Sequence, residues 1–190
     1  MESPFETDIK QCVQILKNDG VILYPTDTIW GLGCDAHHEK AIEKIYQIKQ
    51  RELHKSFVLL MTDVKQLSNY IANPIPDLAS IVSQFTQPTT IIYEQAINLP
   101  HLLVSNEGSI AVRITKDPFC RALIKRLRSP LVSTSVNRSG EPSAANYSMI
   151  QDDIKKEVDY VVHWRQDDSS VAEASTILKL QADGHFIKIR

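Results

Sequence analysis

Apolar and polar positions follow two periods along this chain, one typical of helices and one typical of buried strands. Helical spacing of apolar residues predicts helices at residues 8–19, 38–49, 64–71, 77–85, 117–128 and 147–158. Short apolar and β-branched runs predict strands at residues 21–24, 29–35, 57–61, 89–93, 109–115, 130–133, 160–164 and 175–180. Residues 95–107 read as a loop with one short turn, and Asp183-Gly184 predicts a closing hairpin.

Local breakers and caps give the boundaries of several of these elements. Pro25 cannot donate to a sheet ladder and should end the first strand. Thr7 is the expected cap of the first helix, and Asp63 and Asp117 are those of two later helices. Because strands and helices alternate before the hairpin, we predict an α/β (α+β-like) fold. It forms a single domain over residues 1–190 with a mixed sheet.

Residues 21–35 carry the first candidate chemistry. Hydroxyl and carboxylate side chains, Thr26, Asp27 and Thr28, follow the first strand directly, and glycines at 31 and 33 come soon after. Polar groups at a strand end, beside glycines that permit close backbone approach, suit a small-molecule site. A strand, a turn and a second strand with no ligand explain the same residues equally well.

Composition narrows the class of protein. The net charge of −2 argues against a broad basic surface for nucleic acid, although it leaves room for a local patch. No apolar run approaches the roughly 20 residues of a membrane span, and the start of the chain is acidic where a signal peptide would be basic. We therefore expect a cytoplasmic protein that does not bind membranes. Three scattered cysteines indicate free buried thiols, and the histidines form no metal-binding cluster.

Two clusters of charged and polar residues suggest anion binding. Lys49, Arg51 and Lys55 follow the second long helix, where cations complement the helix dipole but also suit a polyphosphate. The loop 133–143 is rich in hydroxyl and amide side chains, which can hydrogen-bond an anion or a sugar, although an ordinary polar loop looks the same. No Walker or dinucleotide-binding glycine pattern is present.

Two further features concern arginines. Arg113 lies within the apolar strand 109–115, so it must either extend to solvent or hold a carboxylate, such as that of an amino-acid substrate. The helix that begins at Asp117 has a basic face, which is most simply solvated, with RNA contact as the less favoured alternative. That face comprises Arg121, Lys125, Arg126 and Arg128. No Ser-His-Asp order or Cys-His pair supports covalent catalysis, so an enzyme would bind and align reactants.

Taken together and in order, five motifs resemble the YrdC-like threonylcarbamoyl-AMP synthase family in its short, single-domain form. The matching segments are Tyr24-Pro25-Thr26-Asp27-Thr28 with Gly31-Leu32, Lys49-Gln50-Arg51, Ala111-Val112-Arg113-Ile114, Thr134-Ser135-Val136-Asn137-Arg138-Ser139-Gly140 and Ser175-Thr176-Ile177. The resemblance implies a twisted mixed sheet with flanking helices around a deep basic cleft. It also implies an enzyme that joins L-threonine, bicarbonate or CO₂ and ATP into threonylcarbamoyl-AMP and pyrophosphate, for modification of adenosine 37 of tRNA.

The resemblance also assigns roles to residues. Lys49 and Arg51 would be catalytic, and ATP would be held by Lys49, Arg51, Lys55, Ser135, Asn137, Ser143 and Arg190. Threonine would be surrounded by Thr28, Arg113, Ser133 and Ser175. Mg²⁺ would arrive with ATP, with no metal site of the protein itself. tRNA, or proteins of the complex that transfers the threonylcarbamoyl group, would be further partners.

The chain departs from the family pattern at four positions, and two other functions compete. The departures are Leu60 where a histidine is common, Gln87 where a glycine is expected, Val136 for alanine and Ala174 for proline. One alternative is a YciO-like paralogue, although such relatives tend to lose the pair formed here by Ser135 and Asn137. The other is a double-stranded RNA or tRNA binding module that uses the same cleft, which the acidic net charge disfavours.

Overall fold

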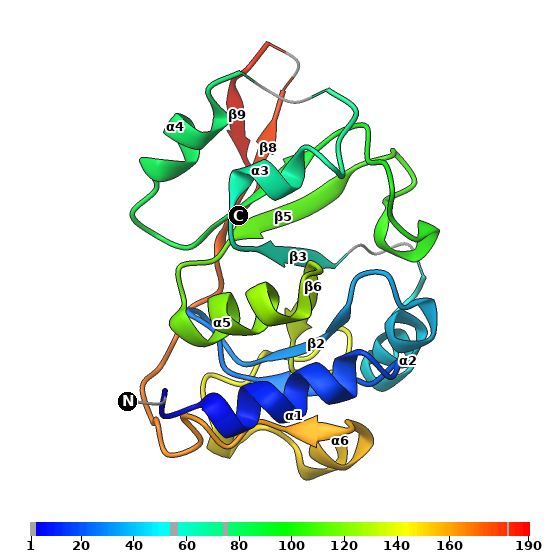
Figure 1. Ribbon diagram of the computed structural model, residues 1–190, viewed down its shortest axis with the longest axis vertical. Coiled ribbons are helices and arrows are strands. Elements are labelled where there is room, and N and C mark those ends of the chain that lie inside the picture. The colour runs from blue at the N-terminus through cyan, green and yellow to red at the C-terminus, as the bar shows by residue number, and fades with distance from the viewer. Residues whose placement is uncertain (1–2, 54–56, 74–75, 182) are drawn as a thin grey trace.

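A nine-stranded mixed sheet forms the centre of the protein (Figure 1). The computed structural model describes residues 3–53, 57–73, 76–181 and 183–190. Within these residues the strand order is β7-β1-β2-β6-β3-β5-β4-β8-β9. The strands are β1 (Ile22–Tyr24), β2 (Gly31–Asp35), β3 (Val58–Met61), β4 (Thr89–Tyr93), β5 (Ile110–Ile114), β6 (Leu131–Ser135), β7 (Tyr160–Val161), β8 (Thr176–Leu180) and β9 (Phe186–Lys188).

Both pairing directions occur in this sheet, which confirms the predicted mixed α/β class. Strand β1 pairs antiparallel with β2, and β6 pairs antiparallel with both β2 and β3. Strands β3 and β5, β4 and β8, and β1 and β7 pair in parallel. Strands β8 and β9 form the expected antiparallel hairpin, in which Gly184 has a φ of +86°, a conformation that glycine adopts without strain.

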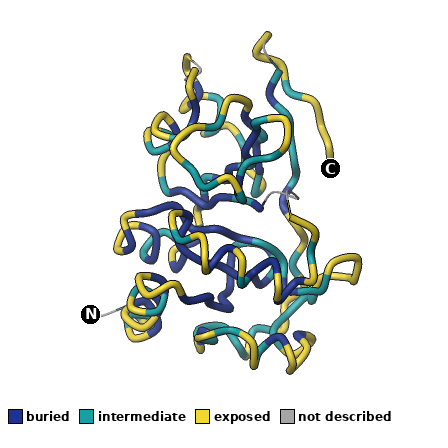
Figure 2. Tube along the Cα trace, turned by 90° about the vertical axis from the view of Figure 1, so that its right-hand side faces the viewer, coloured by how far each residue is buried: buried dark blue, intermediate teal, exposed yellow. Residues whose placement is uncertain are grey.

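Helices cover the sheet and bury its apolar side chains. They are α1 (Glu6–Leu16), α2 (Glu39–Lys49), α3 (Val64–Leu67), α4 (Leu78–Ser83), α5 (Pro118–Leu127) and α6 (Asp152–Glu157), with 3₁₀ turns η1 (His101–Leu103) and η2 (Tyr147–Met149). Helices α1 and α5 lie in front of the lower strands in Figure 1, and α2 lies beside them. Figure 2 shows the buried segments in the middle of the molecule and the exposed ones around its outside. The three cysteines are free and buried, as predicted.

Several predicted boundaries are confirmed and others are wrong. Strand β1 ends at Tyr24, directly before Pro25, and Asp63 and Asp117 cap α3 and α5 through their carboxylates. Thr7, in contrast, lies inside α1, whose N-cap is Phe5 without a side-chain hydrogen bond. The segment 147–158 is not one helix, because η2 and α6 are separated at Ile150, which is buried in extended conformation. Strand β7 is shorter than predicted, and beyond it the backbone N–H groups of His163 and Trp164 donate to Asp8.

The basic face of α5 is only partly the solvated surface that the sequence predicted. The guanidinium of Arg121 donates to the backbone carbonyls of Thr62, at 2.8 Å, and Thr115, at 3.2 Å, so it ties the helix to the ends of β3 and β5. Arg126 pairs with Glu6 of α1 at 2.5 Å, while Lys125 is exposed. Within the described residues, no helix is both long and apolar enough to cross a membrane.

A buried carboxylate fastens α1 to the segment that follows β7. Asp8 is 6% exposed, and it accepts hydrogen bonds from the Tyr160 hydroxyl at 2.6 Å and from the backbone N–H groups of His163 and Trp164 at 3.1 and 2.9 Å. Burial acts to raise the pKa of Asp8, but the donated hydrogen bonds act against it, and the net result is a pKa below the ordinary value. The ionised form is therefore the one that the folded protein stabilises.

Replacing Asp8 by asparagine should lower the free energy of unfolding by about 2–3 kcal/mol at neutral pH, because the amide presents a donor to groups that donate. Since the folded pKa is lowered, this contribution is complete above the ordinary pKa of about 3.9 and is lost as pH falls through the folded value. Urea unfolding of both proteins at several pH values should show that the difference between their free energies of unfolding becomes smaller as the pH falls. Glu43→Gln, which changes an exposed acid of α2, should leave the free energy of unfolding unchanged, and a pH-independent loss in Asp8→Asn would contradict this account.

Candidate functional site

One cavity of about 220 Å³ collects most of the side chains that the sequence singled out. Eight predicted residues line it: Thr28, Arg51, Arg113, Ser133, Ser135, Ser143, Ser175 and Arg190. Sheet register explains this convergence. Gly31 lies opposite Ser135, Val58 lies opposite Ser133, and Leu60 lies opposite Arg113. Because side chains alternate between the two faces of a sheet, Ser133, Ser135, Val58 and Arg113 point to the same face.

Arg113 is the most deeply buried cation of the cavity, with 5% of its surface exposed. Its Nη1 donates to the Thr28 hydroxyl at 3.0 Å, and its Nη2 lies 3.2 Å from a carboxylate oxygen of Asp27. Its Nε is buried and has no hydrogen-bond partner among the described residues. One edge of the guanidinium, that of Nε, is therefore free of protein partners, and a carboxylate that is to reach it has to displace the side chains that cover it.

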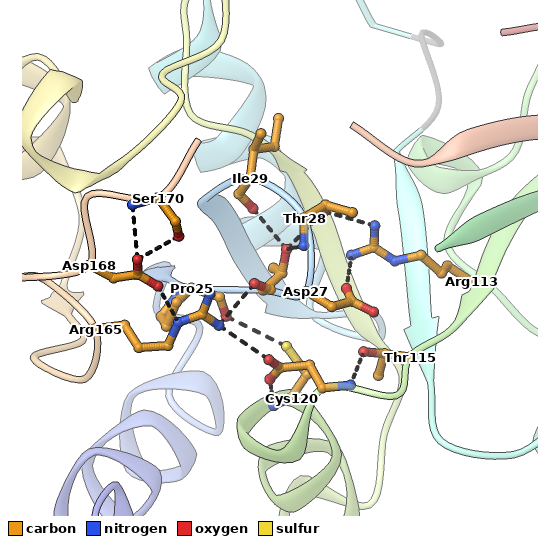
Figure 3. Close-up of polar contacts among 12 residues, drawn as sticks. Pro25, Asp27, Thr28, Ile29, Arg113, Thr115, Cys120, Arg165, Asp168 and Ser170 are labelled. Atoms are coloured by element: carbon orange, nitrogen blue, oxygen red, sulfur yellow. Dashed lines mark hydrogen bonds and ion pairs between the residues drawn. The ribbon is translucent and has the colours of Figure 1, made fainter. Parts of the chain in front are cut away.

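The loop between β1 and β2 presents Asp27 and Thr28 to that guanidinium (Figure 3). The Thr26 hydroxyl folds the loop on itself, because it donates to the Ile29 carbonyl at 2.8 Å and accepts from the Thr28 N–H at 2.9 Å. The two threonine hydroxyls also lie 2.9 Å apart. The sequence placed Thr26 with Asp27 and Thr28 among the polar groups that suit a small-molecule site, but assigned it no ligand.

Glycines allow β1 to come close to the site. The Tyr24 hydroxyl donates to the Ser133 hydroxyl at 2.8 Å, and burial raises the pKa of Tyr24 well above its ordinary value, so the phenol stays protonated. A Cβ on Gly33 would lie 2.7 Å from the Tyr24 ring and 2.8 Å from the Val132 carbonyl oxygen. Gly33 is therefore needed for the close approach of this ring.

Two residues near the C-terminus, Ser175 and Arg190, form another part of the cavity wall. The Ser175 and Thr90 hydroxyls lie 2.8 Å apart, and Arg190 donates to the Ser175 backbone carbonyl at 2.9 Å. Arg51 forms a further part of the rim, with its guanidinium carbon 5.2 Å from the centre of the Phe57 ring. Partial burial lowers the pKa of Arg51, but a guanidinium is not deprotonated in proteins, so Arg51 stays charged. Three cations thus border the cavity: Arg51, Arg113 and Arg190.

Lys49 lies beside the cavity rather than in its lining. It is 1% exposed, and its Nζ donates to the carbonyls of Ser135 and Asn137 at 2.5 and 2.8 Å and to the Asn137 side-chain oxygen at 3.3 Å. Burial and the nearby Arg51 lower the pKa of Lys49 to about 7, while three acceptors favour its ammonium form. Ser135 and Asn137 are joined by a 2.5 Å hydrogen bond. Lys49 therefore holds the start of the loop 136–143.

Arg138, which the sequence did not single out as a site residue, fixes the rest of that loop. It pairs with Asp153 and Glu157 of α6 at 2.7 and 2.6 Å and also donates to the Ile48 carbonyl. The Ser139 N–H donates to the Lys49 carbonyl at 2.8 Å. The loop 136–143 is thus anchored to the end of α2 and to α6.

Lys55, the remaining predicted ATP contact, lies outside the described residues. Other lining residues were not predicted, since apolar side chains such as Trp30, Phe57 and Ile177 give no functional signal in a sequence. Of the four departures, Ala174 lines the cavity, while Leu60 is fully buried and does not. Val136 fits within the core, and Gln87 lines a separate cavity of about 420 Å³ beneath α4.

Comparisons of the amino-acid sequence with known proteins find relatives over most of this chain. A family model described as "Telomere recombination", with the short name Sua5_yciO_yrdC, matches residues 14–190. The protein named threonylcarbamoyl-AMP synthase from Coxiella burnetii is 31% identical over 149 residues, which are 77% of this chain and 80% of that one.

Two solved structures extend the comparison to the fold. E. coli YciO has a TM-score of 0.80 and 27% identity, covering 100% of this chain and 91% of that chain. P. abyssi Sua5, solved in complex with L-threonine, has a TM-score of 0.85 and 19% identity. That alignment covers 100% of this chain and 55% of Sua5, so this chain spans about half of that protein.

Proposed function

Since the chain belongs to the Sua5/YciO/YrdC family, we propose that it is a threonylcarbamoyl-AMP synthase. It would condense L-threonine, CO₂ or bicarbonate, and ATP into threonylcarbamoyl-AMP and pyrophosphate. The observation that carries this proposal is Arg113, a buried guanidinium that lines the cavity together with hydroxyl groups and two further arginines and keeps one edge without a protein partner.

The carboxylate of threonine would bind to the free edge of Arg113, where a planar fork matches two carboxylate oxygens. Hydroxyls of Thr28, Ser133 and Ser175 surround this position and can contact the amino acid. Because the protein already supplies Asp27 to one side of Arg113, the substrate carboxylate would be the second anion on that cation. Two carboxylates on one guanidinium leave one negative charge in excess, which Arg51 and Arg190 at the same cavity would offset.

ATP would bind on the side of the cavity where Arg51, Ser135, Ser143 and Arg190 lie. A cavity of about 220 Å³ does not enclose a whole nucleotide beside an amino acid. The phosphates and the amino acid would therefore lie inside it, and the nucleoside would extend through its open side. Lys55, just beyond Arg51 in the sequence, is proposed as a further phosphate contact.

Lys49 and Asn137 would act on the nucleotide through the loop 136–143. The lysine ammonium already holds the carbonyls of Ser135 and Asn137 at the start of this loop, and Ser135 lines the cavity in which the phosphates would bind. A polyphosphate placed there would favour the protonated lysine and offset the lowering of its pKa by burial.

In the proposed reaction, the amine of threonine adds to the carbon of CO₂ and loses a proton, which gives a carbamate. A carbamate oxygen then forms a bond to the α-phosphorus of ATP, and the bond to the bridging oxygen breaks, so that pyrophosphate leaves with the electron pair. The residues of this chain align the two reactants and offset the growing negative charge through Arg51 and Lys49.

Mg²⁺ would enter with ATP and remain bound to phosphates and water. Within the residues that the structure describes, no three His, Cys, Asp or Glu side chains come together in a group that could hold a metal ion. We also propose that the enzyme acts in the cytoplasm and passes its product to proteins that modify tRNA.

The two alternatives have less support. Ser135 and Asn137, the pair expected to be lost in a YciO-like paralogue, are both present and hydrogen-bonded to each other. An RNA-binding module would not need a buried arginine with a free edge, because phosphate contacts of RNA lie at the surface.

Pyrophosphate release tests the proposed function directly. The purified protein with ATP, Mg²⁺, L-threonine and bicarbonate should release pyrophosphate and form threonylcarbamoyl-AMP, which mass spectrometry would detect. Omission of threonine or bicarbonate should reduce release to background, and L-serine should support less turnover. Equal release without threonine would refute the proposal, and salt-dependent RNA binding that ATP and threonine leave unaffected would favour the RNA-binding alternative.

A further inference from the structure

The segment 162–175 links two strands at distant positions of the sheet. It leaves β7, which is the first strand of the order, and enters β8, which is the eighth. Seven strand spacings of about 4.8 Å amount to about 34 Å, while the segment reaches about 46–50 Å when fully extended. This connecting segment therefore crosses the width of the sheet and still has room for the turn at residues 164–167. Its far end carries Ala174 and Ser175, which line the cavity.

Arg165 fixes the near end of this connecting segment. Its Nη1 donates to the Thr26 backbone carbonyl at 3.0 Å and lies 3.3 Å from Asp117, the N-cap of α5. Its Nε lies 3.3 Å from Asp168, which in turn accepts from the N–H and hydroxyl of Ser170. Figure 3 shows this guanidinium between the connecting segment, the helix and the Pro25–Ile29 loop.

The backbone at Arg165 supports a specific role for this side chain. Its φ of +67° lies in the left-handed region, which is uncommon for a residue with a Cβ and costs on the order of 1 kcal/mol or more. Such a conformation persists when surrounding contacts over-determine it. Here those contacts are the hydrogen bonds and ion pairs of the guanidinium itself.

A continuous set of hydrogen bonds joins Arg165 to the buried arginine of the cavity. Arg165 holds the carbonyl of Thr26, and the hydroxyl of Thr26 contacts both the N–H and the hydroxyl of Thr28. The Thr28 hydroxyl then accepts from Nη1 of Arg113. Movement of the Thr26 carbonyl would therefore alter the direction in which Arg113 presents its free edge.

We infer that Arg165 is a positioning residue for the amino-acid half of the site, acting through Thr26 and Thr28 on the orientation of Arg113. This inference rests on the proposed function, in which Arg113 binds the threonine carboxylate. Arg51 and the loop 136–143 are fixed by other contacts. The effect of Arg165 is therefore confined to the binding of threonine and does not extend to the binding of ATP.

The test compares Arg165→Ala with the intact chain in steady-state kinetics of pyrophosphate release. KM for L-threonine should rise about tenfold, while kcat and KM for ATP should stay within about twofold. Arg165→Lys keeps the charge but cannot bridge the same acceptors, so it should show an intermediate KM for threonine. Guanidinium ion at millimolar concentration should partly restore the alanine variant.

A second readout does not depend on catalysis. The amide of Thr28 donates to the Thr26 hydroxyl, so its hydrogen exchange should be about tenfold faster in Arg165→Ala. Arg126→Ala, which removes an exposed arginine of α5, should change neither measurement.

Two results would overturn the inference: unchanged threonine KM with unchanged Thr28 exchange, or an equal loss for both substrates that parallels a lowered melting temperature. If the intact chain releases no pyrophosphate, the proposed function fails, and the exchange rate of Thr28 still decides the role of Arg165.

Discussion

Replacing Arg113 by methionine should lower kcat/KM for L-threonine by about a thousandfold, which corresponds to roughly 4 kcal/mol. The methionine fills much of the same volume but removes the only buried fork that lines the cavity among the described residues. The loss should fall on threonine rather than on ATP, because the guanidinium lies beside Asp27 and Thr28. Pyrophosphate release at varied threonine and ATP concentrations measures both effects.

A double variant separates chemistry from folding. Arg113→Met alone leaves the carboxylate of Asp27 without its cation, so it should also reduce stability. Asp27→Asn combined with Arg113→Met should recover most of that stability and none of the turnover. Arg113→Lys should retain about one hundredth of the activity, because an ammonium cannot serve Asp27, Thr28 and a substrate carboxylate together. Near-normal turnover in the double variant would exclude carboxylate binding by Arg113.

Arg51→Ala should lower turnover by a factor of about a hundred or more and should raise KM for ATP, with little change in melting temperature. Arg51 is half-buried at the rim of the cavity and lies over the Phe57 ring. Removal of its charge takes away a group that would offset the charge developing on the phosphates. Turnover, both KM values and the melting temperature should be measured on the same preparation.

Lys125→Ala is the matched control for Arg51→Ala. Lys125 is an exposed cation of α5 and does not line the cavity, so its removal should leave KM for ATP unchanged. Full activity of Arg51→Ala would contradict phosphate binding by this residue. If both variants lowered activity to the same extent, the effect would come from net charge rather than from the site.

Most elements of the fold could be predicted because their signals are local. Proline at residue 25, the capping carboxylates of Asp63 and Asp117 and the turn at Gly184 each act on their own neighbours, and all four predictions are confirmed. The start of α1, the break at Ile150 and the short β7 were predicted wrongly. Contacts distant in sequence lie at two of these boundaries, because the N–H of His163 beyond β7 donates to Asp8 and Ile150 is buried in the core.

The candidate site could likewise be predicted only in part. Motif residues could be predicted to be chemically important because hydroxyls, amides and cations are unusual beside apolar strands, as Arg113 and Ser135 illustrate. The partner of each group could not be predicted. Lys49 was expected to face phosphate, yet its ammonium is held by Ser135 and Asn137, and Arg113 already has Asp27 as an internal carboxylate.

By itself the sequence determined the mixed α/β class, the order of the motifs and the set of side chains available for chemistry, because composition and short-range periodicity are written directly in the chain. Tertiary structure alone decided which charges meet, how large the cavity is, and that Arg165 is linked to Arg113 through two threonines. The physical reason is that sheet register and the path of the segment 162–175 bring together groups from distant positions in the chain, and no local pattern encodes those distances.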